Sequence, residues 1–330
     1  MTRRSQRGAA LLLAMLTVTL VATFASAALW QQWRGVEIET AERSRTQMQW
    51  ILNGALDWAR LILQEDARNG EIDHLSEPWA LPLQEARLSS FLAVDKNNTE
   101  DAMDAFLSGQ ITDQQALLNV RNLVQEGKYK PAAFQALTRL FTQLGLPSSQ
   151  LDTLVKQLIA SDAASNADTK PDTQLQGLVK ALAPLKPYRM EQLVWLGLPT
   201  STVQALQPYA TLLPVITPLN LNTASAEVLH AALPSVDMAQ ARQMVASRSS
   251  SHFKTAEDAF KAANMAEGAL RSVDKSDFSV GSHFFAVRGR LRLGDSTVQE
   301  FSLVERNATT VKVIWRQREV QTDTAMASLQ

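Results

Sequence analysis

An uncharged apolar run, residues 9–30, follows a short basic segment at the amino end of the chain. At about 1.5 Å rise per residue, a helix of this length crosses the ~30 Å hydrocarbon core of a bilayer. Three arginines precede the run and favour an amino end on the cytoplasmic side. Helix-compatible sequence continues through Arg60, so we expect one long helix that leaves the membrane and enters a folded domain.

This amino-terminal segment has three competing interpretations. A cleaved secretory signal would use the small residues 25–27, although the apolar run exceeds the roughly 7–15 residues that are usual in a signal. An uncleaved single-span anchor is the second interpretation. The third rests on Arg7-Gly8 directly before Ala9, which resembles the leader of type IV pilins and secretion pseudopilins. In that family a prepilin peptidase cuts after the glycine, and Leu13 would then hold the fifth mature position, where glutamate is usual.

Charge and cysteine content exclude several classes of protein. The 330 residues include 32 basic and 33 acidic side chains, so no overall basic field attracts nucleic acid. Cysteine is absent, which rules out a disulfide framework, a cysteine-ligated zinc site and a cysteine nucleophile. The domain must therefore be stabilised by its core, by a metal or by contacts with partners.

The order of the remaining patterns predicts an α+β fold. Apolar residues between 36 and 63 recur at three- and four-residue steps and form a stripe on the long helix, which is expected to end near Asn69-Gly70. Residues 284–293, 298–306 and 309–316 alternate apolar and polar side chains and predict an antiparallel meander, and residues 110–120 are a possible further strand. Short helical stretches separated by glycine and proline fill residues 128–283, which predicts a helical domain inserted into the sheet-forming domain.

The sharpest internal motif runs from Leu219 to Leu229. Asn222 or Thr223 is expected to cap the helix that follows. The string resembles the start of a helix-hairpin-helix unit, a module that often binds DNA phosphates through a glycine-rich hairpin. Residues 233–237, at the hairpin position, contain no glycine and include Asp237, so a scaffold role is favoured over binding of nucleic acid.

Catalytic signals are weak, and a metal site is the remaining chemical possibility. The four histidines are scattered, and neither a nucleophile elbow nor a phosphate-binding glycine loop is present, so we do not expect an enzyme. Glu65, Asp66 and Asp73 place hard oxygen ligands close together in sequence, as calcium requires, but without the EF-hand spacing.

The chain as a whole resembles one family, the K-type minor pseudopilins of the bacterial type II secretion system. The resemblance spans nearly the whole sequence. It is carried by five stretches: Arg7-Gly8 before the apolar helix with Leu13 in place of the usual glutamate, residues 73–80, Pro187-Tyr188-Arg189 with Glu191 and Leu193, residues 213–225, and residues 280–285.

The resemblance implies a fold, a location and a set of partners. The expected fold is a pilin-like α+β domain, in which a long N-terminal helix packs on an antiparallel sheet, with a large all-helical domain of helix-hairpin-helix or SAM-like type inserted. The expected role is at the tip of a periplasmic pseudopilus, with the I-type and J-type minor pseudopilins and the major pseudopilin as partners. A periplasmic scaffold anchored in the inner membrane is the main alternative.

The same resemblance implies processing and divides the chain into segments. A prepilin peptidase would cut between Gly8 and Ala9, with methylation, and Ala9, Leu13, Leu20 and Leu29 would lie in the inner membrane. The expected segments are a leader (1–8), the long helix (9–68), the first part of the pilin-like domain (69–127), the insertion (128–283), the β-meander (284–320) and a disordered tail (321–330).

Calcium is a possible cofactor by resemblance only. Many family members carry an acidic stretch that binds metal. The corresponding stretch here, residues 157–162, keeps only Asp162 as an acidic residue, which puts inherited calcium binding in doubt.

Overall fold

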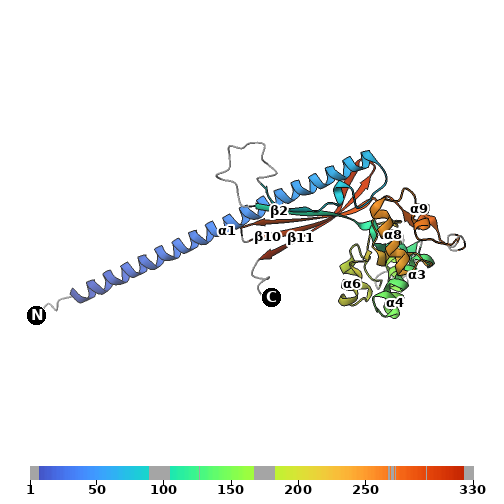
Figure 1. Ribbon diagram of the computed structural model, residues 1–330. Coiled ribbons are helices and arrows are strands. Elements are labelled where there is room, and N and C mark those ends of the chain that lie inside the picture. Colours follow the sequence, from blue (N-terminus) through green and yellow to red (C-terminus); the bar gives the residue numbers. More distant parts are fainter. Residues whose placement is uncertain are drawn as a thin grey trace, which may run out of the picture.

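The computed structural model describes residues 7–88, 105–125, 127–166, 183–266, 268, 271, 273–294 and 296–322. A single long helix runs from the amino end, an antiparallel sheet lies along its second half, and a body of short helices is attached at the end of the sheet remote from the amino terminus (Figure 1). The expected α+β fold with an insertion is confirmed. Residues 1–6 of the predicted leader and 323–330 of the predicted tail lie outside the described residues.

Helix α1, Arg7–Asn69, ends where the sequence predicts. Its buried face in the folded domain is the predicted stripe from Met48 onward, with Met48, Leu52, Leu56 and Leu63 at most 5% exposed. The first residues of the predicted stripe, Val36 and Ile38, are exposed. At about 1.5 Å per residue, its 63 residues span roughly 95 Å, far more than the sheet needs for packing.

Five antiparallel strands form the sheet in the order β1-β2-β9-β10-β11. The bounds of these strands are Leu83–Arg87, Ala105–Asp113, Phe284–Leu293, Ser296–Asn307 and Thr310–Thr322. The strand that the sequence predicts at residues 110–120 corresponds to β2, which begins and ends earlier. The last strand, β11, continues to Thr322, so the predicted start of the tail at 321 is wrong. Neighbours β2 and β9 pair through Gly109 and Gly289, and the chain between them is the insertion.

The insertion contains short helices and three two-residue strand pairs. Its α-helices are α3 (Pro131–Gln143), α4 (Ser148–Asn166), α6 (Thr200–Leu206), α7 (Ala226–Ala232), α8 (Met238–Ser250) and α9 (Ala256–Ala262). The strand pairs are β3 (Leu118–Asn119) with β6 (Ala210–Thr211), β4 (Val124–Gln125) with β5 (Lys128–Tyr129), and β7 (Leu219–Asn220) with β8 (Phe278–Ser279). The 3-10 turns are η1 (Pro78–Ala80), η2 (Gln114–Ala116), η3 (Val120–Leu123), η4 (Met190–Leu196) and η5 (Lys275–Asp277).

Two separate cores stabilise the two parts of the molecule. The core of the insertion includes Leu118, Val120 and Leu123, which lie before the predicted boundary at residue 128. That boundary is therefore too late, because burial assigns these side chains to the insertion and not to the sheet. The second core lies between α1 and the sheet, where Leu63 packs near Phe285 and Val304.

Candidate functional site

The first half of α1 is a bare apolar helix. Leu13, Leu20 and Leu29 are 66%, 53% and 67% exposed, and α1 is long and apolar enough from Ala9 onward to cross a membrane. An exposed apolar surface of this size requires lipid or partner helices. The hydroxyls of Thr17 and Thr23 donate to backbone carbonyls one turn earlier, at 2.9 and 2.8 Å, so these polar side chains also suit an apolar medium.

The end of the apolar run carries an aromatic and basic border. The guanidinium of Arg34 lies 6.0 Å from the ring centre of Trp30, and Trp33 is exposed beside them. Tryptophan with arginine is typical of the interface between lipid and water. Gly8 and Ala9, the predicted cleavage residues, lie in the first turn of α1, which begins at Arg7.

A buried polar junction joins the sheet to the insertion. Its centre is Asp113 at the end of β2, whose Oδ2 accepts hydrogen bonds from Ser282 Oγ and Thr223 Oγ1 at 2.6 Å and from Asn220 Nδ2 at 3.1 Å. The backbone N–H of Gln115 donates to Oδ1 at 2.7 Å. Three segments distant in sequence, at residues 113–115, 220–223 and 282, therefore converge on one carboxyl group.

The 219–229 motif supplies the insertion's side of this junction. Asn222 exchanges two hydrogen bonds with the backbone of Phe253, at 2.8 and 2.9 Å, so it ties the motif to the loop after α8. Helix α7 is capped by Ser225, whose hydroxyl accepts from Val228 N, so the predicted cap at Asn222 or Thr223 is wrong. At the turn between α7 and α8, Asp237 caps α8. The arrangement favours the predicted scaffold role for the motif.

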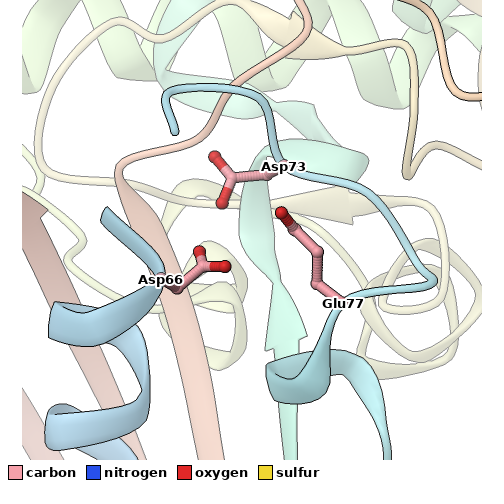
Figure 2. Close-up of side chains that lie close together, drawn as sticks. All are labelled: Asp66, Asp73 and Glu77. Carbon is pink, nitrogen blue, oxygen red and sulfur yellow. The ribbon is translucent and has the colours of Figure 1, made fainter. Parts of the chain in front are cut away.

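Arg306 on β10 makes a second buried cluster beside the first. Its Nη1 donates to Asp66 Oδ2 at 2.6 Å, and its Nη2 donates to both carboxylate oxygens of Asp73 at 2.6 Å and to Ser282 O at 2.9 Å. Asp66 comes from the end of α1, Asp73 from the following loop, and Glu77 from the start of η1 (Figure 2). One guanidinium thus joins the long helix, its following loop and the sheet.

The loop that carries Asp73 approaches the segment between β8 and β9 so closely that only glycine fits opposite it. A Cβ atom at Gly281 would lie 2.2 Å from the carbonyl oxygen of Glu71. This approach lets Asp73 N donate to Val280 O at 2.9 Å, and Ser282 N donate to Asp73 Oδ2 at 2.7 Å. Backbone pairing therefore positions the carboxylate for Arg306.

The predicted metal ligands do not fit calcium. Asp66, Asp73 and Glu77 offer carboxylate oxygens within 4.8 Å of one another, but Arg306 binds two of these groups and supplies the positive charge itself. Calcium takes about six to eight oxygen ligands, and none of its usual ligand sets includes a guanidinium. Glu77 accepts instead from His74 N at 2.9 Å and from Trp79 Nε1 at 2.7 Å.

The two other predicted ligands, Glu65 and Asp162, are outside this cluster and bind other side chains. Asp162 on α4 accepts from Arg121 Nη2 at 2.6 Å and from Lys186 Nζ at 3.1 Å, and these cations hold the pKa of its carboxyl below the ordinary value against the effect of burial. Glu65 pairs with Arg68 on the surface of α1 at 2.9 Å. Basic side chains, and not a metal ion, therefore bind these carboxylates.

Burial sets the protonation of the carboxyl groups in the junction and in the Arg306 cluster beside it. It raises the pKa of Asp73 from 3.8 to about 7, and the opposing effects of Arg306 and the N–H of Ser282 are smaller. Burial also raises the pKa of Asp113, which has hydroxyl and amide donors around it. Burial therefore favours the neutral form of both carboxyl groups over the charged form that they would have in water.

This preference predicts that stability falls as pH rises from about 4 to about 7. The unfolded chain releases the proton of Asp73 near pH 3.8, whereas the folded chain holds it up to about 7, so the folded state binds more protons in that window. We expect the urea midpoint of unfolding to decrease across this range. Asp73→Asn should flatten this dependence on pH. The control Asp152→Asn, at an exposed position of α4, should leave it unchanged. Equal slopes in the wild type and both variants would contradict the raised pKa of Asp73.

Together, a bare amino-terminal helix, a sheet on its second half and a helical insertion define a pilin-like fold whose apolar helix is compatible with a membrane anchor. Two sequence models described as Type II secretion system (T2SS), protein K, match residues 116–215 and 219–281. The chain belongs to the type II secretion system protein K family, the K-type minor pseudopilins, and the predicted resemblance is confirmed.

Three curated relatives share that description. The type II secretion system protein K of Pseudomonas aeruginosa is 28% identical over 89% of this chain and 86% of its own length. Those of Klebsiella pneumoniae and Pectobacterium carotovorum are each 26% identical, covering 94% and 96% of this chain and 96% and 97% of their own lengths. A chain from the crystal structure of the GspK-GspI-GspJ complex of enterotoxigenic Escherichia coli shares the fold, with a TM-score of 0.64 and 20% identity over 84% of this chain and 98% of that chain.

Proposed function

We propose that the chain is the minor pseudopilin at the tip of a type II secretion pseudopilus, where it supports export of proteins across the outer membrane. The observation that carries the proposal is the division of α1 into a bare apolar half and a half that holds the sheet and the insertion (Figure 1). In this proposal, prepilin peptidase cuts between Gly8 and Ala9. Ala9, Leu13, Leu20 and Leu29 lie in the inner membrane, and the domain beyond Arg34 lies in the periplasm.

Assembly would move the apolar helix from lipid into a bundle of similar helices. Such a transfer is tolerable because the partner helices cover the same apolar surface that lipid covered. The proposal assigns the chain a mechanical role and no catalytic one, consistent with the structural character of its family.

Two features favour the tip over a position inside the filament. Leu13 leaves the helix without the carboxylate that would meet the terminal amine of a subunit ahead of it. The insertion also forms a bulky body at the end of the sheet remote from the amino terminus (Figure 1), where it would obstruct a further subunit. Both features suit a subunit with nothing beyond it.

The relative solved as a GspK-GspI-GspJ complex supports I-type and J-type minor pseudopilins as the partners of this chain. The proposal also places the major pseudopilin below them. We expect the detergent-solubilised full chain, coexpressed with both partners, to elute as a single complex in which native mass spectrometry finds one copy of each. The chain alone should form no filaments. If the chain and the partners elute separately at micromolar concentration, the tip assignment fails and the anchored scaffold replaces it.

A further inference from the structure

The sheet has one face covered by α1, and the insertion covers one end of its other face, where Leu213 packs with Phe284 and Leu303. The rest of this second face is called the open face. Val287 and Leu291 of β9 pack in the cores beneath α1, and a Cβ atom at Gly289 would contact Leu52 at 3.3 Å. Because side chains alternate along a strand, the three arginines between and beyond these positions lie on the open face: Arg288, Arg290 and Arg292. The open face thus carries a row of guanidinium groups on its central strand, in a chain whose net charge is only −1.

Aromatic rings hold these guanidinium groups in place. Arg292 lies 4.2 Å from the ring centre of Phe106 on β2, and Arg288 lies 5.7 Å from that of Phe301 on β10. Phe301 stacks in turn on Trp315 of β11, with ring centres 5.2 Å apart. A guanidinium held against a ring keeps its N–H donors free to bind a planar carboxylate.

Unused hydrogen-bonding groups gather on the same face. Within the described residues, the buried side-chain polar atoms without a partner are Arg290 Nε, Thr297 Oγ1 and Trp315 Nε1, which belong to three adjacent strands. A buried polar group left unpaired costs about 1–3 kcal/mol, so the side chains of this face are not fully satisfied by one another. No ion pair joins Arg288 or Arg290 to a described carboxylate, whereas Arg292 pairs with Glu85 at 2.7 Å.

A cleft adjoins this row where the insertion approaches the sheet. It has a volume of about 650 Å³, with Arg288, Phe301 and Trp315 among its lining residues on the sheet side and Arg189 and Gln207 on the insertion side. Arg189 lies 5.6 Å from the ring centre of Trp315 and donates to Gln317 Oε1 at 2.8 Å. Cationic side chains therefore line both walls and aromatic side chains line the sheet wall, with Glu191 and Glu319 also at the cleft.

We propose that the open face and its cleft bind an acidic, extended peptide segment of a partner protein. Carboxylates of the segment would bind Arg288 and Arg290, and its apolar side chains would pack on Phe301 and Trp315. Anionic lipid is the poorer candidate, because α1 first packs on the sheet at Met48, and the 18 residues from Trp30 correspond to roughly 27 Å of helix. The inference does not depend on the position of the chain in a pseudopilus.

Fluorescence polarisation with the detergent-solubilised full chain tests the proposal. The probe is a labelled glutamate-rich peptide with leucines between the glutamates, and a glutamine version is its control. We expect binding of the first peptide, weakened by salt, and on the order of tenfold weaker binding after Arg288→Ser with Arg290→Ser. The exposed pair Arg242→Ser with Lys156→Ser removes the same charge elsewhere and should leave binding unchanged.

Because Arg290 is partly buried, the exposed Arg288→Glu supplies a second variant that spares the fold. It should also weaken binding, with an unchanged circular dichroism spectrum. Equal affinity for the two peptides, or equal affinity in wild type and both variants, would overturn the proposal. So would binding to phosphatidylglycerol vesicles without binding to the peptide.

Discussion

Arg306→Ala is expected to lower the free energy of unfolding by about 3–5 kcal/mol, because it leaves buried carboxylates without their cation. Arg306 is 5% exposed and Asp73 is 1% exposed, so water does not take over the lost contacts. The loss should be smaller near pH 5 than near pH 8, since burial raises the pKa of Asp73 to about 7 and a proton can replace the cation at the lower pH. Urea unfolding followed by circular dichroism measures both effects.

Arg68→Ala is the matched control for this variant. Its partner Glu65 also lies near the end of α1, at 2.9 Å, but both side chains are more than 60% exposed. Exposed pairs of this kind contribute about 0–1 kcal/mol. Arg306→Lys should fall between the two, because a lysine cannot contact Asp66, Asp73 and Ser282 O at once. A loss below about 1 kcal/mol for Arg306→Ala would show that the cluster is not what joins α1 to the sheet.

The two clusters explain how a force along α1 would reach the insertion. Arg306 joins the end of the helix to β10, and Asp113 joins β2 to the 219–229 motif. Ser282 belongs to both, because its hydroxyl donates to Asp113 and its carbonyl accepts from Arg306. The mechanical role proposed for this chain would need such a continuous connection, and buried hydrogen bonds supply one.

Periodic patterns were the part of the fold that the sequence could predict. The stripe on α1 and the meander follow from the local spacing of apolar residues, and the end of that helix follows from the Asn69-Gly70 pair. The predicted run 110–120 extends too far because β2 ends at Asp113, whose side chain accepts from Gln115 N and caps the turn η2. The predicted boundary at 128 is too late because the sequence does not indicate which of the cores the apolar residues before it join.

The junction and the Arg306 cluster could not be predicted, because their residues pair across long separations in sequence. Asp113 and Asn220 are 107 positions apart, and Arg306 and Asp73 are 233 apart. Arg306 occupies a strand position where exposure would be the ordinary expectation for an arginine. The sequence shows the acidic residues 65–73 as a cluster. It does not show that the cation bound by Asp66 and Asp73 is the guanidinium of Arg306 and not a metal ion.

Gly8→Val is expected to abolish removal of the leader, which is the largest effect that we predict. The proposed cleavage lies between Gly8 and Ala9, and a peptidase that requires a small residue there cannot approach a branched one closely. Intact mass spectrometry should find Ala9 as the first residue of the wild-type chain and an uncut leader in the variant. Ala10→Val makes the same kind of change two residues later and should be processed normally.

The leader carries three arginines, so its retention has a physical consequence for assembly. Each charge costs about 2.5–3.5 kcal/mol at the centre of a bilayer on insertion scales, and an apolar helix bundle would be similarly unfavourable. An uncut chain should therefore stay in the inner membrane and fail to join its partners, although its domain folds. A wild-type chain that begins at Met1 or Thr2 would indicate a plain anchor, and one that begins at Ala28 would indicate a cleaved signal. Either result would remove the pseudopilin processing on which the tip assignment depends.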